Sequence, residues 1–314
     1  LPLSITSPLP CRPIMKRLGI IDLDSSHSVE FTRRFNHIGV DRDQCVDGAK
    51  VVLAWPGSSE MAPERIPGFQ REMESFGIEL VDEPVAMLGQ IDAVLILSLC
   101  GAAHLERARP FLKAGLPTFI DKPFTCSLTD AVELITLAED THTPLWNASA
   151  MRFSEQVQSI NRRIDQLGRV HGVVSYGPSK RADGNPGLFH YGIHAVEVLF
   201  QLMGTGCESV TTTWTPGGEV VTGLWTDGRI GTVRGSRDGA TSYGFIAFCE
   251  NAVVTEHLST RYAYRNLCQQ IVHSLETDSL PVSHPSTLEV VRFITAASRS
   301  ESLNGASVQL DDAT

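Results

Sequence analysis

The feature that most constrains the fold is a series of short apolar runs in the first half of the chain. They span Arg17–Leu23, Val51–Trp55, Ala93–Leu99 and Pro117–Ile120. The third run is rich in Val, Ile and Leu and shows no alternation of apolar with polar residues, which is typical of a strand buried on both faces of a parallel sheet. Helical segments separate the runs. This alternation of predicted strands and helices predicts a Rossmann-type, doubly wound α/β domain over residues 15–149.

Two helices in this half have clear end signals. Gly115 ends a helix over Ala102–Ala114. Ser127 begins S-L-T-D, which places an N-cap serine three residues before an acid and predicts a helix to about Asp140.

The second half of the chain is predicted to consist of strands divided by turns. A helix over Leu188–Met203 comes first, and the turn signals that follow are Pro216-Gly217-Gly218, Asp227-Gly228 and Asp238-Gly239. Asp-Gly between β-rich runs favours a hairpin. Two helices, Ala263–Thr277 and Thr287–Ser302, close the chain. We therefore predict a second domain over residues 150–314, an α+β unit with a large, mostly antiparallel, open sheet.

Composition narrows the classes of function. The 314 residues include 26 Lys and Arg against 36 Asp and Glu, a net charge of -10. This disfavours nucleic acid or an anionic membrane as the main partner, because both require a basic face. No apolar run reaches the roughly 18 residues that a membrane-spanning helix needs. The seven cysteines form no C-x-x-C pair, so we expect reduced thiols and a cytoplasmic location. Residues 1–14 lack the apolar core of a signal peptide and are expected to be an N-terminal tail.

Polar residues follow the first predicted strand, where a dinucleotide-binding protein carries its glycine-rich loop. Asp22 and Asp24 stand where the first two glycines of a G-x-G-x-x-G motif would fall, and carboxylates there would repel a pyrophosphate. Candidates to border a ligand at this strand end are Asp24, Ser25, Ser26 and His27. The alternative is that Ser26 or Ser28 only caps the helix that follows.

The ends of the next strands supply weaker candidates. Trp55 ends the second run without the acid or arginine that often meets the adenosine ribose. Ser98 and Cys100 follow the third run, and His104 lies one turn into the next helix, where it could bind a ligand, cap the helix or pack.

The most informative segment is Asp121-Lys122-Pro123. A lysine between a buried strand and a proline is held at the crevice, where partial burial would make it a usable general acid or base. An ordinary surface lysine is the alternative.

The start of the helix predicted over Leu188–Met203 is the second such segment. His190, His194 and Glu197 are spaced i, i+4 and i+7 and would share one helix face. Two imidazoles and a carboxylate on one face suit acid–base catalysis, and the histidine pair also has a zinc-site spacing. A solvated helix face is the alternative.

Together these residues resemble the Gfo/Idh/MocA family, which includes glucose–fructose oxidoreductase and inositol dehydrogenase. The resemblance extends over about residues 16–310. Asp121-Lys122-Pro123 resembles the family's E-K-P motif, Met151-Arg152-Phe153 its R-F segment, and Gly187–Glu197 its G-G-x-x-x-D-x-x-x-H-x-x-D helix. Within that helix His194 matches the family histidine, and His190 stands where the family has an aspartate.

The resemblance implies hydride transfer between NAD or NADP and a sugar, a polyol or a related hydroxy or keto compound. Lys122 and His194 would then surround the reacting oxygen as acid–base groups, with His190 as a third catalytic residue. Implied cofactor contacts are Asp22, Asp24, Ser25, Ser26, His27, Trp55, Ser98, Cys100, His104, Asp121 and Lys122. Implied substrate contacts are Lys122, Arg152, Tyr176, His190, Tyr191 and His194. Lys180 and Arg181 are further candidates to meet an anionic group of the substrate. The resemblance also implies a homo-oligomer, a dimer or tetramer formed through the open sheet. No metal ligand is assigned in this interpretation.

Two other functions stay open at this point. Because Asp22 and Asp24 oppose a pyrophosphate, the chain could be a cofactor-free ligand-binding or regulatory protein. A metal-dependent lyase or hydrolase could instead use His190 and His194.

Overall fold

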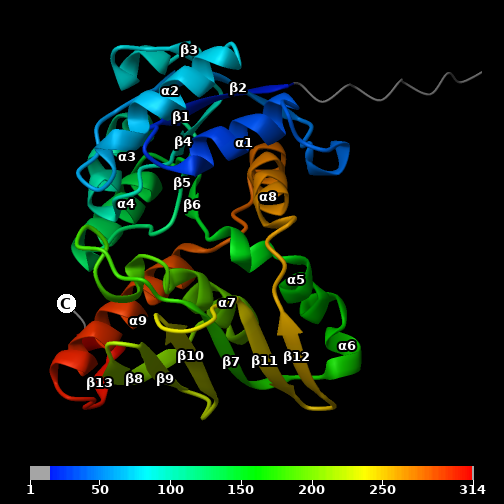
Figure 1. Cartoon of the computed structure of the whole chain (residues 1–314), viewed down its shortest axis with the longest axis vertical. Helices are drawn as coiled ribbons and strands as arrows, with labels where there is room; N and C mark the ends of the chain where they lie inside the picture. Colours follow the sequence, from blue (N-terminus) through cyan, green and yellow to red (C-terminus); the bar gives the residue numbers. More distant parts are fainter. Residues whose placement is uncertain (1–14, 313–314) are drawn as a thin grey trace, which may run out of the picture.

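The first half of the chain forms a parallel six-stranded sheet. The computed structural model describes residues 15–312 (Figure 1). The strands run in the order β3-β2-β1-β4-β5-β6, and every pairing is parallel. Their bounds are β1 Lys16–Ile21, β2 Ala49–Trp55, β3 Glu79–Leu80, β4 Ala93–Ile96, β5 Thr118–Ile120 and β6 Leu145–Asn147. The predicted doubly wound sheet is confirmed, and its strand order reverses between β1 and β4, where such folds place their ligands.

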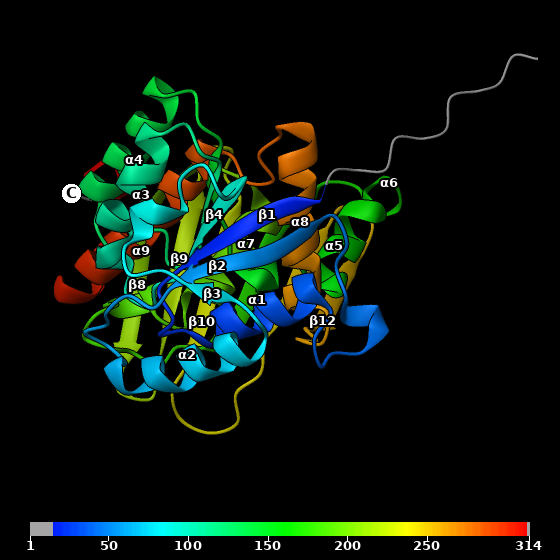
Figure 2. The same ribbon diagram turned by 90° about the horizontal axis from the view of Figure 1, so that it is seen from above.

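Helices cover both faces of this sheet. Figure 2 shows α1 (Ser26–Asn36) and α2 (Ile66–Ser75) on one side and α3 (His104–Lys113) and α4 (Leu128–Asp140) on the other. The Ser127 cap is confirmed, since its hydroxyl accepts the Asp130 N–H at 3.2 Å. The alternative that Ser26 or Ser28 caps α1 was wrong: Ser25, in extended conformation, accepts the His27 N–H, and Ser26 is already helical.

The second half forms a seven-stranded sheet in the order β12-β11-β7-β10-β9-β8-β13. Its strands are β7 Val170–Pro178, β8 Cys207–Thr215, β9 Gly218–Trp225, β10 Ile230–Ser236, β11 Gly244–Cys249, β12 Val253–His257 and β13 Val308–Gln309. Only β7 and β10 pair in parallel among the described strands of this sheet, so the mostly antiparallel sheet is confirmed.

The turn signals of this half were correct in two of three places. Gly217 and Asp227-Gly228 lie in the connections of the antiparallel pairs β8–β9 and β9–β10. Asp238-Gly239 does not form a hairpin, because β7 lies between β10 and β11 and pairs with both. A local turn signal cannot report a strand inserted from about 60 residues earlier in the chain.

Helices α7 (Ile193–Met203) and α9 (His284–Ser302) pack on one face of the second sheet (Figure 1). The shorter α5 (Glu155–Arg162) and α6 (Ile164–Leu167) precede β7. Helix α8 (Ala263–Thr277) instead leaves this sheet and packs beside α1 of the first half. Residues from α8 therefore reach the ligand-binding edge of the first sheet. The division between residues 149 and 150 stays a prediction. Within residues 15–312, no helix is both long and apolar enough to cross a membrane.

Candidate active site

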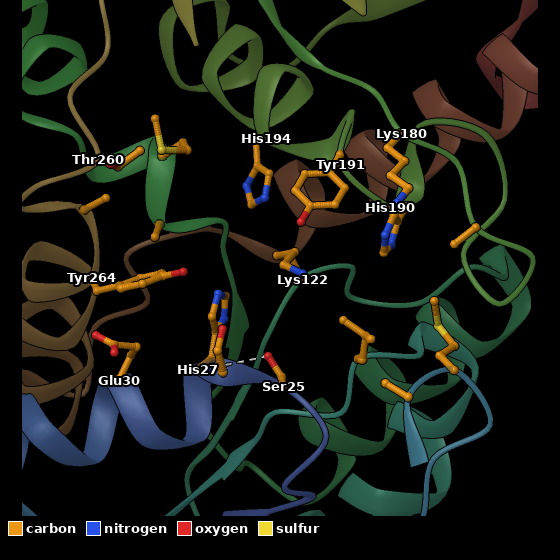
Figure 3. A pocket seen from close by; sticks show the side chains of 18 of the residues that line it. Ser25, His27, Glu30, Lys122, Lys180, His190, Tyr191, His194, Thr260 and Tyr264 are labelled. Carbon is orange, nitrogen blue, oxygen red and sulfur yellow. Dashed lines mark hydrogen bonds between the residues drawn. The ribbon is translucent and has the colours of Figure 1, made fainter. Parts of the chain in front are cut away.

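A cavity of about 590 Å³ lies at the carboxyl end of the first sheet and is lined by residues from both halves of the chain (Figure 3). That volume is within the range of small-molecule sites. Of the residues proposed from sequence, the structure brings nine together on its wall: Ser25, Ser26, His27, Lys122, Lys180, Arg181, His190, Tyr191 and His194. Lys180 comes from the loop after β7, and the cavity also borders Tyr264 from α8. It therefore joins the start of α1, the end of β5 and the start of α7.

Lys122 is held in the cavity by the strand that precedes it and by β6. The Asn147 side chain at the end of β6 donates to the Ile120 and Asp121 carbonyls at 2.9 and 3.0 Å, which fixes the backbone before the lysine. Lys122 is only 8% exposed, and Figure 3 shows its amine among the cavity side chains. The surface-lysine alternative was wrong, because β5 ends inside the molecule.

His194 lies on the first turn of α7 with its ring over the cavity. Its Nδ1 is 2.6 Å from the Ser149 hydroxyl, which also accepts the Met151 N–H. Burial, followed by the charge of Lys122, lowers the pKa of His194 to about 3. The ring is therefore neutral near pH 7 and acts there as a hydrogen-bonding group.

His190 lines the same cavity but not on a helix. The prediction that α7 starts at Leu188 was wrong: Gly187–Phe189 forms a 3-10 turn, His190 has φ -78° and ψ -91°, and the helix begins at Ile193. Burial, then Lys122, Lys180 and Arg65, lower the pKa of His190 to about 4. Its Nδ1 is buried and has no partner among the described residues.

Glu197 does not share a catalytic face with the two histidines. It is buried and forms an ion pair with Arg152, which also donates to Gln201 at 3.2 Å. Burial raises the pKa of Glu197, and Arg152 opposes that effect. The predicted substrate contact of Arg152 is therefore not supported, because this pair lies outside the cavity wall and ties α7 to the segment after β6.

Asp22 stands at the first glycine position of the dinucleotide-binding motif, and its backbone adopts a conformation that glycine favours. Its φ is 68°, a left-handed conformation that Asp tolerates better than most residues. The carboxylate accepts the Ser98 hydroxyl and lies 3.0 Å from Arg107 Nε. It also fills the space beside Gly57, where an added Cβ would lie 1.6 Å from Asp22 Oδ1.

Asp24 is likewise turned away from the cavity. Its Oδ1 accepts the Leu99 N–H at 3.0 Å, and its side chain is buried. The expected repulsion of a pyrophosphate assumed two free carboxylates at the start of α1. The structure instead gives Asp22 a countercharge and Asp24 a backbone donor, and leaves Ser25 and Ser26 at the helix N-terminus on the cavity wall. A helix N-terminus is a favourable place for a phosphate, so these residues fit a dinucleotide.

The remaining sequence candidates support the site without lining it. Trp55 stacks under the Arg107 guanidinium, 4.6 Å from the ring centre. His104 is fully buried and bridges the Ser98 and Phe124 carbonyls at 3.0 Å each. The Cys100 thiol donates to the Gly184 carbonyl at 3.5 Å. These contacts order the loops after β2, β4 and β5.

Tyr176 lies away from the cavity, and Arg181 lines it with its charge already paired. The Tyr176 hydroxyl is 3.2 Å from His257 Nδ1, on the β7–β11–β12 side of the second sheet. Arg181 borders the cavity, but its guanidinium pairs with Glu219 and Glu301. Lys180 lines the cavity and forms no ion pair with any described residue.

Sequence reasoning missed four residues that shape the site: Tyr264, Arg65, Ser149 and Arg107. Tyr264 arrives on α8, and Arg65 lies in the loop after β2. Ser149 and Arg107 act through His194 and Asp22. Their roles depend on long-range packing, and no local pattern in the sequence marks them.

The described residues hold no group of three or more His, Cys, Asp or Glu side chains arranged for a metal ion. The metal-dependent alternative therefore has no ligand set in this part of the chain. His190 and His194 point to the cavity from different backbone conformations and do not form the expected i, i+4 pair on one helix.

Comparison with known proteins agrees with this geometry. Residues 46–149 match the GFO_IDH_MocA family model, described as an oxidoreductase family with an NAD-binding Rossmann fold. This part of the chain is therefore similar to that oxidoreductase family. The matched region begins after α1, so the altered loop at Asp22 and Asp24 lies outside it.

A curated relative matches part of the chain. The D-apiose dehydrogenase of Paraburkholderia graminis is 30% identical over 132 residues, which are 41% of this chain and 32% of the relative. The match thus spans about a third of the length of that relative.

Solved structures share the fold over nearly the whole chain. A probable dehydrogenase from Thermotoga maritima superposes with a TM-score of 0.79 at 16% identity, over 95% of this chain and 100% of that one. A scyllo-inositol dehydrogenase from Lactobacillus casei, solved with NAD(H) and scyllo-inositol, gives 0.77 at 15% identity, over 95% and 100%.

Proposed function

We propose that this protein belongs to the Gfo/Idh/MocA family and is an NAD- or NADP-linked dehydrogenase that oxidises or reduces a sugar, a polyol or a related hydroxy or keto compound. The observation that carries the proposal is the meeting of Lys122 and His194, from different halves of the chain, beside the N-terminus of α1 in one cavity. The names of the similar proteins support the substrate class.

The cofactor would accept or supply the hydride. Ser25, Ser26 and the first backbone N–H groups of α1 would hold its phosphates, and the countercharge of Arg107 keeps Asp22 from opposing them. The loop after β2 approaches the same cavity through Arg65. The cysteines of the described residues are free thiols, which suits a reducing compartment, so the proposal includes a cytoplasmic location.

The substrate oxygen would lie between Lys122 and His194. The lysine donates to that oxygen and stabilises the negative charge that develops on it. His194 stays neutral, because its pKa is lowered to about 3, and its Nδ1 is oriented by Ser149. The unpartnered Nδ1 of His190 can accept a hydrogen bond from a second substrate hydroxyl.

The test is turnover with NAD⁺ and NADP⁺ against a panel of aldoses, polyols and their acids, using Lys122→Met with Lys113→Met as the matched control. Lys113 is exposed at the end of α3 and lies outside the cavity wall. K122M should reduce kcat at least about 100-fold, as is typical for loss of an acid–base or oxyanion-stabilising group, while K113M keeps it. Full activity of K122M would contradict the proposal.

We also propose that the open face of the second sheet forms a homo-oligomer interface. Four exposed apolar side chains lie in one cross-strand row: Leu224, Ile230, Phe248 and Val253. Light scattering after gel filtration should show a dimer or tetramer that Phe248→Glu dissociates. Leu303→Glu, at an exposed apolar site near the end of α9, is the control. A monomeric wild-type chain would refute this proposal.

A further inference from the structure

His27 carries a carboxylate partner that the other cavity histidines lack in the described chain. Its Nδ1 lies 2.5 Å from Asp121 Oδ2, and the two side chains are only 9% and 2% exposed. His27 is the first-turn residue of α1, and Asp121 directly follows β5. The pair therefore joins two neighbouring loops at the floor of the cavity.

His27 also completes the replacement of the glycine-rich loop. In the G-x-G-x-x-G spacing that begins at Asp22, the three glycine positions are taken by Asp22, Asp24 and His27. The third glycine normally allows the helix to pack closely on the strand. Here that position supplies an imidazole to the cavity wall.

Aromatic contacts hold the His27 ring in one orientation. Phe31 stacks on it with ring centres 5.3 Å apart, and Tyr264 meets it edge-on at 4.8 Å. Figure 3 shows the ring standing beside Tyr264 and pointing into the cavity below Lys122 and His194. With Nδ1 bonded to Asp121, the other nitrogen, Nε2, faces the cavity.

The charge of Asp121 decides which ring nitrogen of His27 carries the proton. Burial would raise the pKa of this carboxyl, but the attraction and hydrogen bond of His27, together with Lys122, outweigh burial and hold the pKa below its usual value. An ionised carboxylate only accepts hydrogen bonds, so Nδ1 of His27 must be the donor. A neutral His27 ring then keeps its lone pair on Nε2, as in the histidine–aspartate pairs that act as bases in hydrolases.

We propose that His27 and Asp121 form the acid–base pair of this site, with Nε2 of His27 exchanging the proton of the reacting hydroxyl group. The proposal rests on the dehydrogenase function proposed above. In the oxidation, the substrate C–H bond breaks and its electron pair leaves as hydride to the nicotinamide cofactor. The O–H proton passes to Nε2, and the C–O bond becomes C=O. The substrate is oxidised, the cofactor is reduced, and the reverse reaction returns the proton from Nε2.

This assignment separates the roles of the cavity groups. His190 and His194 are weak bases, with pKa values lowered to about 4 and about 3. Lys122 stabilises the charge on the substrate oxygen, and His27 moves the proton. The charged or titratable groups that face His27 are Asp121, Lys122, Glu30, Arg34, His194 and Tyr264. Of these, Arg34 is paired with Glu30 on α1.

The first test reads the tautomer and needs no substrate. Nitrogen-15 NMR of histidine-labelled protein, recorded across a pH series, should show that the neutral form of His27 carries its proton on Nδ1. His27→Gln assigns the signal, and His273→Gln, on the exposed face of α8, is the control. In Asp121→Asn the amide can donate to Nδ1, so the proton should move to Nε2. A wild-type ring protonated on Nε2 would overturn the proposal.

The second test uses turnover once a substrate is known. H27Q and D121N should each lower kcat about 100-fold or more with little change in coenzyme affinity, while H273Q keeps kcat. Asp121→Glu should recover part of the activity. If K122M is inactive but H27Q turns over normally, the dehydrogenase proposal stands and the His27–Asp121 pair is refuted. If the wild type never turns over, the NMR tautomer still decides whether the pair is built as described.

Discussion

Removal of the Arg107 guanidinium should destabilise the protein in a pH-dependent way. Arg107→Met keeps the length of the side chain but takes away the cation that lies 3.0 Å from the Asp22 carboxylate. Asp22 is 1% exposed, and its Oδ1 already lacks a partner among the described residues. The variant therefore leaves a buried carboxylate with the Ser98 hydroxyl as its remaining side-chain donor.

The size of the effect follows from the burial of the two partners. Breaking a buried ion pair by removing one side usually costs about 3–5 kcal/mol. The Arg107 side chain is 24% exposed, so solvent screens part of the attraction, and we expect the lower end, about 3 kcal/mol. The stacking of Arg107 on Trp55 contributes to the same total.

The sign of the pH dependence comes from Asp22. Burial raises the pKa of this carboxyl above its usual value in the folded protein, and Ser98 and Arg107 limit the rise. Between the pKa of the unfolded state and the higher pKa of the folded state, Asp22 keeps its proton only when the protein is folded. The free energy of unfolding therefore falls as the pH rises through the folded pKa. Without Arg107 the folded pKa rises further, so the deficit of R107M should be smallest near pH 4 and largest near pH 8.

Urea unfolding at several pH values measures this deficit. Arg109→Met is the matched control, because Arg109 lies on the same helix and, among the described residues, pairs only with exposed Glu106 and half-exposed Glu133. R109M should lower the free energy of unfolding by less than about 1 kcal/mol. Asp22→Asn combined with R107M should recover most of the loss, since Asn tolerates a φ of 68°. The reasoning fails if R107M equals R109M at pH 8, or if the double variant is as unstable as R107M.

Three further outcomes are expected. Glu197→Gln should lower the free energy of unfolding by about 3–5 kcal/mol, measured in urea, because it leaves the buried Arg152 guanidinium unpaired. Gly57→Ala should lower the midpoint of thermal unfolding, since its Cβ would meet Asp22 Oδ1 and its φ is 68°. Lys180→Met should reduce kcat/KM for a sugar acid about tenfold more than for the matching neutral sugar, and equal losses would argue against an anion site at Lys180.

The first sheet was predictable because its signal is local. A parallel strand covered on both faces needs an apolar run such as Ala93–Leu99, and this run can be recognised in the sequence without knowledge of distant contacts. The run overstated the length of the strand, since β4 ends at Ile96 and the remaining residues lead into the cavity loop. The helix cap at Ser127 was likewise predictable, because its signal lies within four consecutive residues.

The site was only partly predictable because its contacts join distant segments. The spacing of His190 and His194 suggested one helix face, but the backbone at His190 leaves the helical region before α7 begins. Asp22 was expected to carry an unopposed charge, and its partner Arg107 comes from α3. His27 was a candidate only as a neighbour of the phosphates, whereas its bond to Asp121 depends on how α1 lies against β5.

Direct coenzyme binding tests the central claim that this cavity serves a dehydrogenase. NADH and NADPH can be titrated into the purified protein by calorimetry, with energy transfer from Trp55, at the end of β2, as a second signal. The account predicts saturable binding of one coenzyme in the micromolar range, weakened in R107M by the unopposed charge of Asp22. Absence of binding for both coenzymes to the folded wild-type protein would contradict it.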